Sequence, residues 1–503
     1  MPSFDARDRY LGIDVGTSAV KALLLDEDDR IVAEASAPLQ VRRPRPRWSE
    51  QDPDHWWSAT QKAVASLRGA VPEGLAGLCG VGLSGQMHGA TLLGRDERPL
   101  RPAILWNDGR SAVECAALER AVPELRKITG NRAMPGFTAP KLLWVRTHEP
   151  DVFARIARVL LPKDYVRLCL TGAAATDVSD AAGTLWVDVG RRDWSETLLG
   201  ACDLGVEHMP ALHEGPEVTG QLRPEVARAW GCEPVPVVAG AGDNAAGAVG
   251  VGVVEPGRAF LSLGTSGVYF VANESFQPNP EGAVHAFCHA LPGRWHQMAV
   301  LLSAASCLAW IARATGAQDE AALLDEVSAR GSRSDRLLFL PYLSGERTPH
   351  DDPDATGVFV GIDHETDRAA LARAVLEGVA FAFADGERVL REAGARIERV
   401  AVIGGGARSD LWVGILASVL ERPLVRLRGG EVGPALGAAR LARLGVTGLP
   451  PEEVCREPTV ESEVAPDGRL AEHYAAKLAQ FRALYGSLRE HFRSESATPR
   501  EEA

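Results

Sequence analysis

Two stretches of the chain place apolar residues at alternate positions on both sides of a short Gly-Thr-Ser sequence. One covers residues 10–26 around Gly16-Thr17-Ser18, and the other covers residues 259–272 around Gly264-Thr265-Ser266. An apolar residue at every second position is typical of a half-buried β-strand, and a glycine between two such runs favours a hairpin turn. The pattern therefore predicts the same β-hairpin twice, about half a chain apart.

Repetition of this hairpin predicts two similarly built domains that each contribute one turn to a shared site. A proline-containing break at residues 232–236 is followed by a new apolar strand, so we place the division there. The predicted domains are residues 1–234 and residues 235–492. The polar residues 493–503 are expected to form a disordered tail.

Longer runs with apolar residues at helical spacing lie between and after the hairpins. The first covers residues 54–67 and follows Asp52-Pro53, a typical pair of N-cap and first helical residue. Two others cover residues 371–393 and 469–491. Because the remaining segments alternate between helix and strand patterns, we expect an α/β fold.

The composition is that of a globular protein with an acidic balance. The 503 residues are 46% hydrophobic and 24% charged, and 54 lysines and arginines face 67 aspartates and glutamates, a net charge of −13. This sign is opposite to that of surfaces that neutralise nucleic acid, so we expect no nucleic-acid partner. No apolar run approaches ~20 residues, the length of a membrane-spanning helix, and the first residues lack the apolar core of a signal peptide. We therefore expect a cytoplasmic protein with no membrane partner.

Eight cysteines are scattered singly along the chain, with no Cys-x-x-Cys pair. This distribution indicates free thiols in a reducing compartment. His285, Cys288 and His289 lie close together and raise the question of a zinc site. A structural zinc site takes four ligands, and no second cluster of such residues exists, so we favour a core or loop position for these three.

The two predicted hairpin turns carry the chemistry of a phosphate-binding site. Glycine and small hydroxyl residues at a turn expose backbone N–H groups and hydroxyls that can surround a phosphate oxygen. Asp14 leads into the first turn, where its carboxylate is placed to hold a hydrated Mg²⁺ against nucleotide phosphates. A hairpin that merely needs glycine would explain a single turn, and the second copy favours phosphate binding. The predicted phosphate-binding residues are Gly16, Thr17, Ser18, Gly264, Thr265 and Ser266.

A third glycine-rich segment follows a predicted strand at residues 400–403 and precedes a helix that begins near Leu411. Such a step lets a nucleotide approach the backbone closely, and three glycines exceed what a tight turn, the plain alternative, requires. Residues 80–85 match G-x-G-x-x-G but lead into another strand, and no G-x-x-x-x-G-K-[ST] motif occurs, so neither common phosphate loop is predicted. The residues predicted to contact adenosine are Gly404, Gly405, Gly406 and Ala407.

Asp243 stands at the junction between a predicted strand at residues 235–239 and a predicted helix. A carboxylate in this position is either a helix N-cap or a general base. Beside two phosphate-binding turns, an unpaired carboxylate can accept the proton of a hydroxyl group that attacks a γ-phosphoryl group. We therefore predict that Asp243 is catalytic, together with Asp14.

Two further segments combine apolar side chains with hydrogen-bonding groups, as a polyol site requires. They are Gln86-Met87-His88 and Trp106-Asn107-Asp108. Because a Met-His pair is usually part of the core, this interpretation stays open on the residues alone. The predicted sugar-binding residues are Gln86, Met87, His88, Trp106, Asp108 and Asn244.

Taken together, these residues resemble the FGGY family of carbohydrate kinases over nearly the whole chain. Residues 136–144, Gly-Phe-Thr-Ala-Pro-Lys-Leu-Leu-Trp, are similar to the first signature of the family. Residues 357–377 are similar to the second, with a departure at Ala370, where the signature usually has a polar residue. Glycerol kinases of the family carry Arg-Glu where Met87-His88 stands here. The segments that resemble the members acting on D-xylulose are residues 84–91, 102–110, 161–165, 179–184 and 343–349.

The resemblance implies an α/β, two-domain sugar kinase/actin-like (ribonuclease H-like) fold with the active site in the interdomain cleft. It implies ATP-dependent phosphorylation of D-xylulose to D-xylulose 5-phosphate, with ATP and Mg²⁺ as cofactors and a homodimer as a possible assembly. The alternatives are a kinase for ribulose, gluconate or another polyol, a non-catalytic sugar-sensing regulator, and an actin-like or chaperone ATPase.

The resemblance also implies roles for particular residues. Met87 and His88 would contact D-xylulose, and Asp243 would accept the proton. Asp14 would support Mg²⁺ through water. The residues implied to hold ATP are Gly264, Thr265 and residues 404–407.

Overall fold

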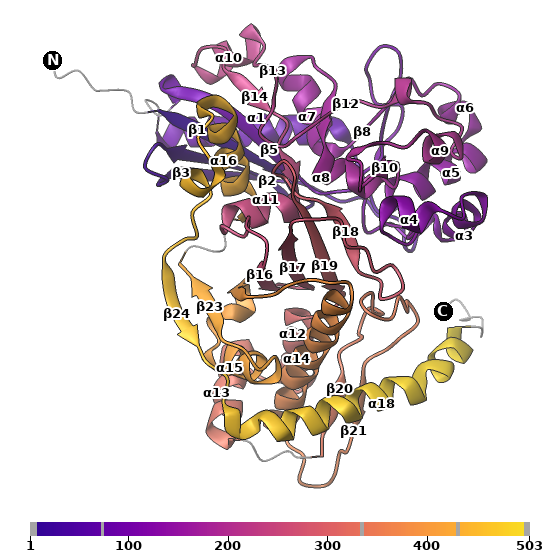
Figure 1. The fold of residues 1–503 in the computed structure, drawn as a ribbon, viewed down its shortest axis with the longest axis vertical. Coiled ribbons are helices and arrows are strands. Elements are labelled where there is room, and N and C mark those ends of the chain that lie inside the picture. The colour runs from indigo at the N-terminus through magenta and orange to yellow at the C-terminus, as the bar shows by residue number, and fades with distance from the viewer. Residues whose placement is uncertain (1–7, 72–74, 332–335, 429–432, 497–503) are drawn as a thin grey trace, which may run out of the picture.

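The fold is built around two mixed β-sheets, which lie in the upper and lower halves of Figure 1. The computed structural model describes residues 8–71, 75–331, 336–428 and 433–496. The first sheet contains β13 (Val218–Gln221), β14 (Pro236–Val238), β5 (Leu78–Gly85), β1 (Arg9–Val15), β2 (Ala19–Asp26) and β3 (Ile31–Pro38) in this order, with β15 (Ala241–Gly242) beside β5. The second contains β18 (His285–Cys288), β19 (Trp295–Leu301), β17 (Gly267–Asn273), β16 (Arg258–Leu263), β22 (Arg399–Ile403), β23 (Leu424–Leu427) and β24 (Val460–Val464).

Five strands of each sheet share one arrangement. In the first sheet β1 pairs antiparallel with β2, β2 antiparallel with β3, β1 parallel with β5, and β5 parallel with β14. In the second sheet β16, β17, β19, β22 and β23 repeat these neighbours and directions. Both predicted hairpins and their repetition are therefore confirmed, because β1 with β2 and β16 with β17 enclose the two Gly-Thr-Ser turns.

Helices cover the sheets, and the predicted helical segments are confirmed with small shifts at their ends. Asp52 caps the first of them, since its carboxylate accepts a hydrogen bond from the Asp54 N–H at 3.0 Å. The helices of the first half are α1 (Pro53–Ala70), α3 (Ala112–Ala121), α4 (Leu125–Thr129), α5 (Thr138–His148), α6 (Pro150–Phe153), α7 (Pro162–Thr171), α8 (Val178–Ala181), α9 (Glu196–Gly200), α10 (Pro224–Trp230) and α11 (Asp243–Gly250). Those of the second half are α12 (Ala305–Ala314), α13 (Glu320–Arg330), α14 (Arg368–Glu392), α15 (Asp410–Val419), α16 (Gly433–Thr447), α17 (Pro451–Val454) and α18 (Ala471–Ser496).

Short strands and 3₁₀ turns complete the fold. Two-stranded sheets pair β4 (Glu50–Gln51) with β7 (Ala103–Ile104), β6 (Thr91–Leu93) with β8 (Arg158–Leu160), β9 (Ala175–Asp177) with β12 (Ala211–His213), β10 (Val187–Asp188) with β11 (Asp193–Trp194), and β20 (Leu338–Leu340) with β21 (Val358–Val360). The 3₁₀ turns are η1 (Ala182–Thr184), η2 (Val206–His208), η3 (Gly405–Arg408) and η5 (Gly468–Leu470).

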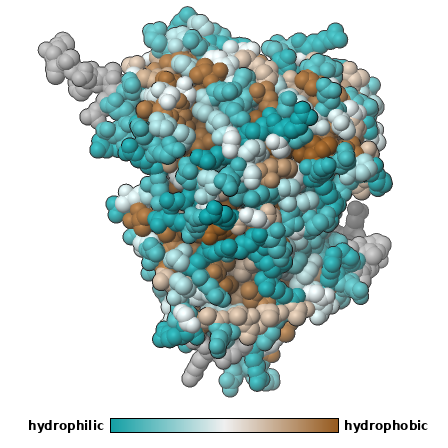
Figure 2. All heavy atoms as spheres, viewed as in Figure 1, coloured by the Kyte–Doolittle hydropathy of each residue, from teal (hydrophilic) through white to brown (hydrophobic). Residues whose placement is uncertain are grey.

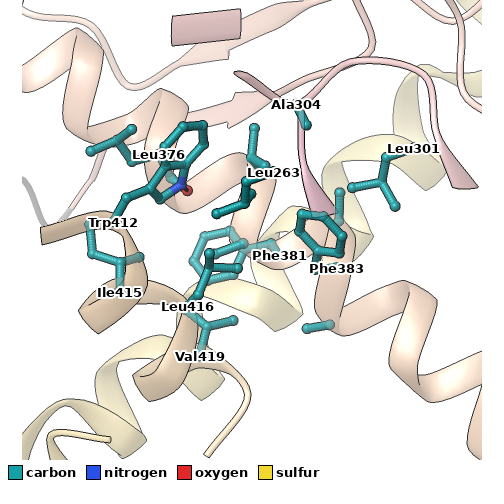
Figure 3. Packing of buried hydrophobic residues seen from close by; sticks show 14 of the residues in the cluster. Leu263, Leu301, Ala304, Leu376, Phe381, Phe383, Trp412, Ile415, Leu416 and Val419 are labelled. Atoms are coloured by element: carbon teal, nitrogen blue, oxygen red, sulfur yellow. Dashed lines mark hydrogen bonds between the residues drawn. The ribbon is translucent and has the colours of Figure 1, made fainter. Parts of the chain in front are cut away.

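The apolar residues are mostly buried on the inner faces of these layers. In the core of the second half, Leu263 at the end of β16 packs with Trp412 of α15, whose indole N–H donates to the Leu376 carbonyl at 3.2 Å (Figure 3). The face shown in Figure 2 is largely hydrophilic, with apolar residues in separate patches. Among the helices that the structure describes, none is both long and apolar enough to span a lipid bilayer.

Helix α16 comes from the end of the chain but packs on the first sheet, where it lies beside β1 in Figure 1. Glycines make this close approach possible. A Cβ atom on Gly12 of β1 would lie 1.9 Å from the Ala435 carbonyl oxygen, and one on Gly82 of β5 would lie 1.9 Å from that of Ala438. The glycines of residues 80–85 thus belong to a strand and serve helix packing rather than a dinucleotide.

The predicted division after residue 234 does not coincide with the edge of the first sheet. Strands β14 and β15 lie beyond that position and both pair in parallel with β5. The proline-containing break that suggested a domain boundary is only the connection between α10 and β14. At the other end, α18 continues past residue 493 to Ser496, and the rest of the predicted tail lies outside the described residues.

Candidate active site

The ends of β16 and β22 open into a cleft of about 1170 Å³. Gly264 and Thr265 of the second hairpin turn line it together with Gly405 and Gly406 of the third glycine-rich segment. Ser266, Gly404 and Ala407 adjoin these residues in the chain. The remaining walls come from α12, α13 and the start of α15. The structure therefore brings together the two segments predicted to bind the nucleotide.

Gly404 allows these two segments to touch. Its φ is +89°, and a Cβ atom there would lie 2.9 Å from the carbonyl carbon and oxygen of Leu263. The second turn is also held by α12, because the Ala305 N–H donates to the Gly264 carbonyl at 2.8 Å. Within the described parts of the chain, no acceptor faces the N–H groups of Thr265 and Ser266. These groups are available to an anionic ligand.

The first turn is held differently, by side chains. The Thr17 hydroxyl donates to Gln86 Oε1 and accepts from the Trp106 indole N–H, both at 3.0 Å. The Gln86 amide donates to Gln51 Oε1 at 2.9 Å, and the Gln51 amide donates to the Thr17 carbonyl at 2.7 Å. Both ends of buried Gln86 are thus engaged inside the protein. The Thr17 and Ser18 N–H groups have no acceptor among the residues described, so a phosphate at this turn would meet N–H groups rather than the Thr17 hydroxyl.

Asp14 and Asp243 form a pair of carboxylates at the carboxyl ends of parallel strands. In the ladder Asp14 lies beside Ser84, which lies beside Ala241 of β15, and Asp243 begins α11 two residues later. Ser84 donates to Asp14 Oδ1 at 3.1 Å. The backbone and side-chain N–H groups of Asn244 donate to Asp243 Oδ1 at 2.7 and 3.0 Å. Asn244, predicted to bind sugar, therefore orients the neighbouring carboxylate.

Burial raises the pKa of both carboxyls, and the charge of Asp14 adds to the rise at Asp243. Burial raises the pKa of Asp14 to about 6. Burial, followed by the charge of Asp14, raises the pKa of Asp243 to about 7. Asp243 therefore takes up a proton near neutral pH, as an effective general base must. Asp243 is not the N-cap residue of α11, because Gly242 occupies that position.

His88 is held in a strained, neutral state. Its φ is +69°, and its carbonyl accepts hydrogen bonds from the Thr138 hydroxyl at 3.1 Å and from Lys141 Nζ at 2.9 Å. Burial lowers the pKa of its imidazole to about 3. Nδ1 lies 2.6 Å from the Gly183 carbonyl, so the neutral ring carries its proton there and leaves Nε2 as an acceptor.

Met87 adjoins the segment that carries the base, whereas Asp108 is engaged elsewhere. A Cβ atom on Gly242 would lie 3.0 Å from Met87 Cγ. The Asp108 carboxylate accepts four hydrogen bonds, one from the Ser49 N–H and three from Arg110, which fill its lone pairs. The prediction of Asp108 as a sugar ligand is therefore corrected: its carboxylate anchors the Arg110 loop. Trp106, 38% exposed, is accessible to ligands.

Several residues near this site carried no assigned role in the sequence. Arg347 donates from Nη1 to His285 Nε2 at 3.3 Å. Phe137 packs edge-on against both His88 and His285, with centroid separations of 4.8 and 5.5 Å. The signals were present, since Phe137 and Arg347 belong to segments 136–144 and 343–349. Both residues contact histidines that lie far away in the sequence, so no local sequence pattern predicts these contacts.

The possible zinc ligands do not form a metal site. In the described ranges, no group of three or more His, Cys, Asp or Glu side chains is placed to hold a metal ion. His285 and His289 instead pack in the core, and burial lowers the pKa of both imidazoles. All eight cysteines are free, as predicted.

Two family models match the chain in succession. The N-terminal domain of the FGGY family of carbohydrate kinases matches residues 9–250, and the C-terminal domain of that family matches residues 259–445. The chain belongs to the FGGY family of carbohydrate kinases. As an FGGY kinase it transfers phosphate from ATP to an alcohol group of a sugar. The first match runs past residue 235, as the first sheet does.

Relatives with known names cover nearly the full length of this FGGY kinase. It is 54% identical to the xylulose kinase of Escherichia coli K12 over 95% of this chain and 99% of that protein, and 53% identical to that of Klebsiella pneumoniae over 95% and 99%. Among solved structures, a xyloylose kinase from Brucella ovis matches with a TM-score of 0.93 and 51% identity, over 96% of this chain and 99% of that one. The xylulose kinase of Rhodospirillum rubrum matches with a TM-score of 0.90 and 31% identity, over 96% and 100%. The expected two-domain sugar kinase/actin-like fold is confirmed.

Proposed function

We propose that this FGGY kinase catalyses the ATP-dependent phosphorylation of D-xylulose to D-xylulose 5-phosphate. The observation that carries the proposal is the direct succession of Gly242, which packs against Met87, and Asp243, the carboxyl with a pKa of about 7. This succession places Met87, a candidate sugar-binding residue, beside a candidate base that titrates near neutral pH. The names of its curated relatives, xylulose kinases at 54% and 53% identity, support the choice of sugar.

Asp243 acts as the general base in this proposal. Its carboxylate orients the C5 hydroxyl of the sugar and takes up the proton as the oxygen attacks the γ-phosphorus of ATP. The O–P bond to ADP breaks while the new O–P bond forms, and ADP leaves. Asn244 keeps the carboxylate in position through its two hydrogen bonds to Oδ1.

His88 selects and orients the sugar. Because its Nδ1 proton is directed at the Gly183 carbonyl, Nε2 can only accept, and it would accept from a sugar hydroxyl. Met87 supplies an apolar wall beside it. Trp106 and Gln86 contribute indirectly, since they hold the Thr17 side chain.

The charge of the transferring phosphoryl group would be stabilised by backbone N–H groups of both turns. Those of Thr17, Ser18, Thr265 and Ser266 have no acceptor in the part of the chain that the structure describes. Preorganised donors of this kind stabilise charge that develops in the transition state. The glycines of the third segment would let the nucleotide lie close to the backbone of the cleft.

The carboxylate pair fits a magnesium ion. Mg²⁺ prefers oxygen ligands and is usually bound by one or two carboxylates together with phosphate oxygens and water. Asp14 and Asp243 provide two such groups, at the carboxyl ends of two strands that both pair in parallel with β5. Asp14 would hold the ion through water, and the ion would neutralise phosphate charge.

A panel of acceptors tests the proposal. ADP release is coupled to a spectroscopic signal with D-xylulose, D-ribulose, gluconate and glycerol in turn, and with no acceptor. We expect the highest kcat/KM for D-xylulose and almost no ADP without a sugar. A tenfold preference for another acceptor would refute the substrate, and equal ADP release without acceptor would refute the kinase mechanism.

A further inference from the structure

A wholly buried ion cluster lies at the start of α7. Lys163 Nζ is 2.6 Å from Asp164 Oδ1, 2.8 Å from Asp177 Oδ2 and 3.2 Å from Asp180 Oδ2, and all four side chains are inaccessible to solvent. Burial raises the pKa of the Asp180 carboxyl well above its usual range, against the opposing effect of the Lys163 charge. Buried ion pairs add little net stability over apolar residues of the same volume. Stability alone therefore explains this cluster poorly.

A chain of hydrogen bonds connects the cluster to the backbone beside the base. Asp177 Oδ1 accepts from the Ser179 N–H at 2.8 Å and also from the Ser179 hydroxyl. Ser179 Oγ in turn accepts from the Gly242 N–H at 3.1 Å. Gly242 is the N-cap residue of α11, and Asp243 follows it directly. The Ser179 hydroxyl therefore fixes the peptide group between Ala241 and Gly242, directly before the base.

The same region also holds the backbone that precedes the base and the side chain of the sugar-binding candidate His88. Arg167, four residues after Lys163 on α7, donates to the Val238 carbonyl at 2.6 Å and to the Ala239 carbonyl. Gly183 provides the carbonyl that fixes the His88 imidazole. Two segments with no assigned role, residues 161–165 and 179–184, thus converge on the groups proposed to perform the reaction.

We propose that Ser179, held by Asp177 and Lys163, is a positioning residue that sets the orientation of the Asp243 carboxylate. The inference rests on the proposed role of Asp243 as general base. Ser179 does not touch the reacting atoms. It acts through the Gly242 peptide, so its loss should misdirect the base while leaving the binding sites for ATP and sugar in place.

Ser179→Ala is the test, with Ser111→Ala as the matched control. Ser111, like Ser179, is a fully buried serine of the first half. Its hydroxyl donates a hydrogen bond to the Pro135 carbonyl at 3.2 Å. We expect Ser179→Ala to lower kcat about tenfold or more, to change either KM less than threefold, and to shift the apparent pKa of the kcat/KM profile. Ser111→Ala should leave all three unchanged, and both variants should unfold at similar urea concentrations.

Other outcomes overturn the inference. A kcat within threefold of the wild type, or a fall in kcat that merely follows lost stability with an unmoved pH profile, would reduce Ser179 to a structural residue. Should Ser179→Ala not fold, Ser179→Cys keeps the volume but weakens the hydrogen bonds, and a native kcat in that variant would overturn the inference. All assays use the acceptor that the wild type phosphorylates best. If the proposed substrate is wrong, the acceptor panel with the wild type shows it. If the positioning role of Ser179 is wrong, only the comparison of the variants with the wild type shows it.

Discussion

The two hairpin turns occupy equivalent places in equivalent sheets, yet their surroundings differ. The first follows Asp14 and is tied by side chains to Gln86 and Trp106, on the side of the predicted sugar residues. The second follows Ser262 at the matching position, is held by α12 and Gly404, and lines the large cleft. Equivalent positions of the duplicated scaffold thus carry a carboxylate in one copy and the wall of an open cleft in the other. The difference shows that the chemistry comes from what packs around each turn.

Removal of the base should have the largest effect. General-base assistance contributes about 10²–10⁴-fold, so Asp243→Ala should lose about 3–5 kcal/mol of transition-state stabilisation. Steady-state kcat/KM for the sugar measures this loss, and circular dichroism should show a native fold. Near-native turnover would remove Asp243 from the mechanism.

Asp14→Asn and Ser262→Ala test the asymmetry between the turns directly. Asp14 carries the charge proposed to support Mg²⁺ and phosphate, so Asp14→Asn should lower kcat by about 10²-fold, or about 3 kcal/mol. Ser262→Ala, at the same position of the other hairpin, should change kcat less than threefold. An equal fall in kcat in both variants would show that Asp14 and Ser262 contribute equally to the reaction, which would contradict the proposed asymmetry.

Gly404→Ala and Gly405→Ala form a second matched pair, confined to the nucleotide side. A Cβ atom at Gly404 would collide with the Leu263 backbone and force a strained φ, whereas one at Gly405 meets no atom within 4 Å. Gly404→Ala should raise the KM for ATP about tenfold, because backbone strain of this kind costs about 1–3 kcal/mol. In Gly405→Ala the added methyl group displaces no protein atom, so a rise in its KM for ATP would report contact with the nucleotide proposed to lie there. A larger effect on the sugar KM would place Gly404 in the wrong site.

His88→Asn sharpens the sugar side of the comparison. Asparagine tolerates a positive φ, so the backbone is kept while the Nε2 acceptor is lost. One hydrogen bond contributes about 0.5–1.5 kcal/mol, and the KM for the sugar should rise up to about tenfold. The KM for ATP serves as the internal control. If both KM values rise together, His88 supports the fold as a whole.

The raised carboxyl pKa values predict opposite effects of pH on activity and stability. Asp243 must be ionised to act, so kcat/KM should rise with pH and level off above about 7. Stability should move the other way, because between about pH 4 and pH 7 the native carboxyl keeps a proton that the unfolded chain has lost. Asp243→Asn removes this difference in proton binding, so its free energy of unfolding at pH 8 should exceed that of the wild type by about 1–3 kcal/mol. Urea unfolding at pH 5 and pH 8 measures it, and a pH-independent difference would contradict the raised pKa.

Local sequence patterns located several of the elements and the two glycine-rich segments that line one cleft. Alternation located both hairpins, and Asp52-Pro53 located the start of α1. The hydrogen bonds that occupy the Asp108 carboxylate and the Thr17 hydroxyl involve partners from distant segments, so the sequence did not predict them. The same is true of α16, which reaches the first sheet from the end of the chain. The homodimer, the cytoplasmic location and the roles of the site residues stay predictions.

The most direct test of the account is a structure of the enzyme with D-xylulose and a non-hydrolysable ATP analogue. We predict that the C5 hydroxyl oxygen lies within about 2.6–3.2 Å of an Asp243 carboxylate oxygen. The terminal phosphate should lie on the other side of that hydroxyl, contacted by N–H groups of both turns. An Asp243 carboxylate directed away from the sugar, or a terminal phosphate that contacts neither turn, would contradict it.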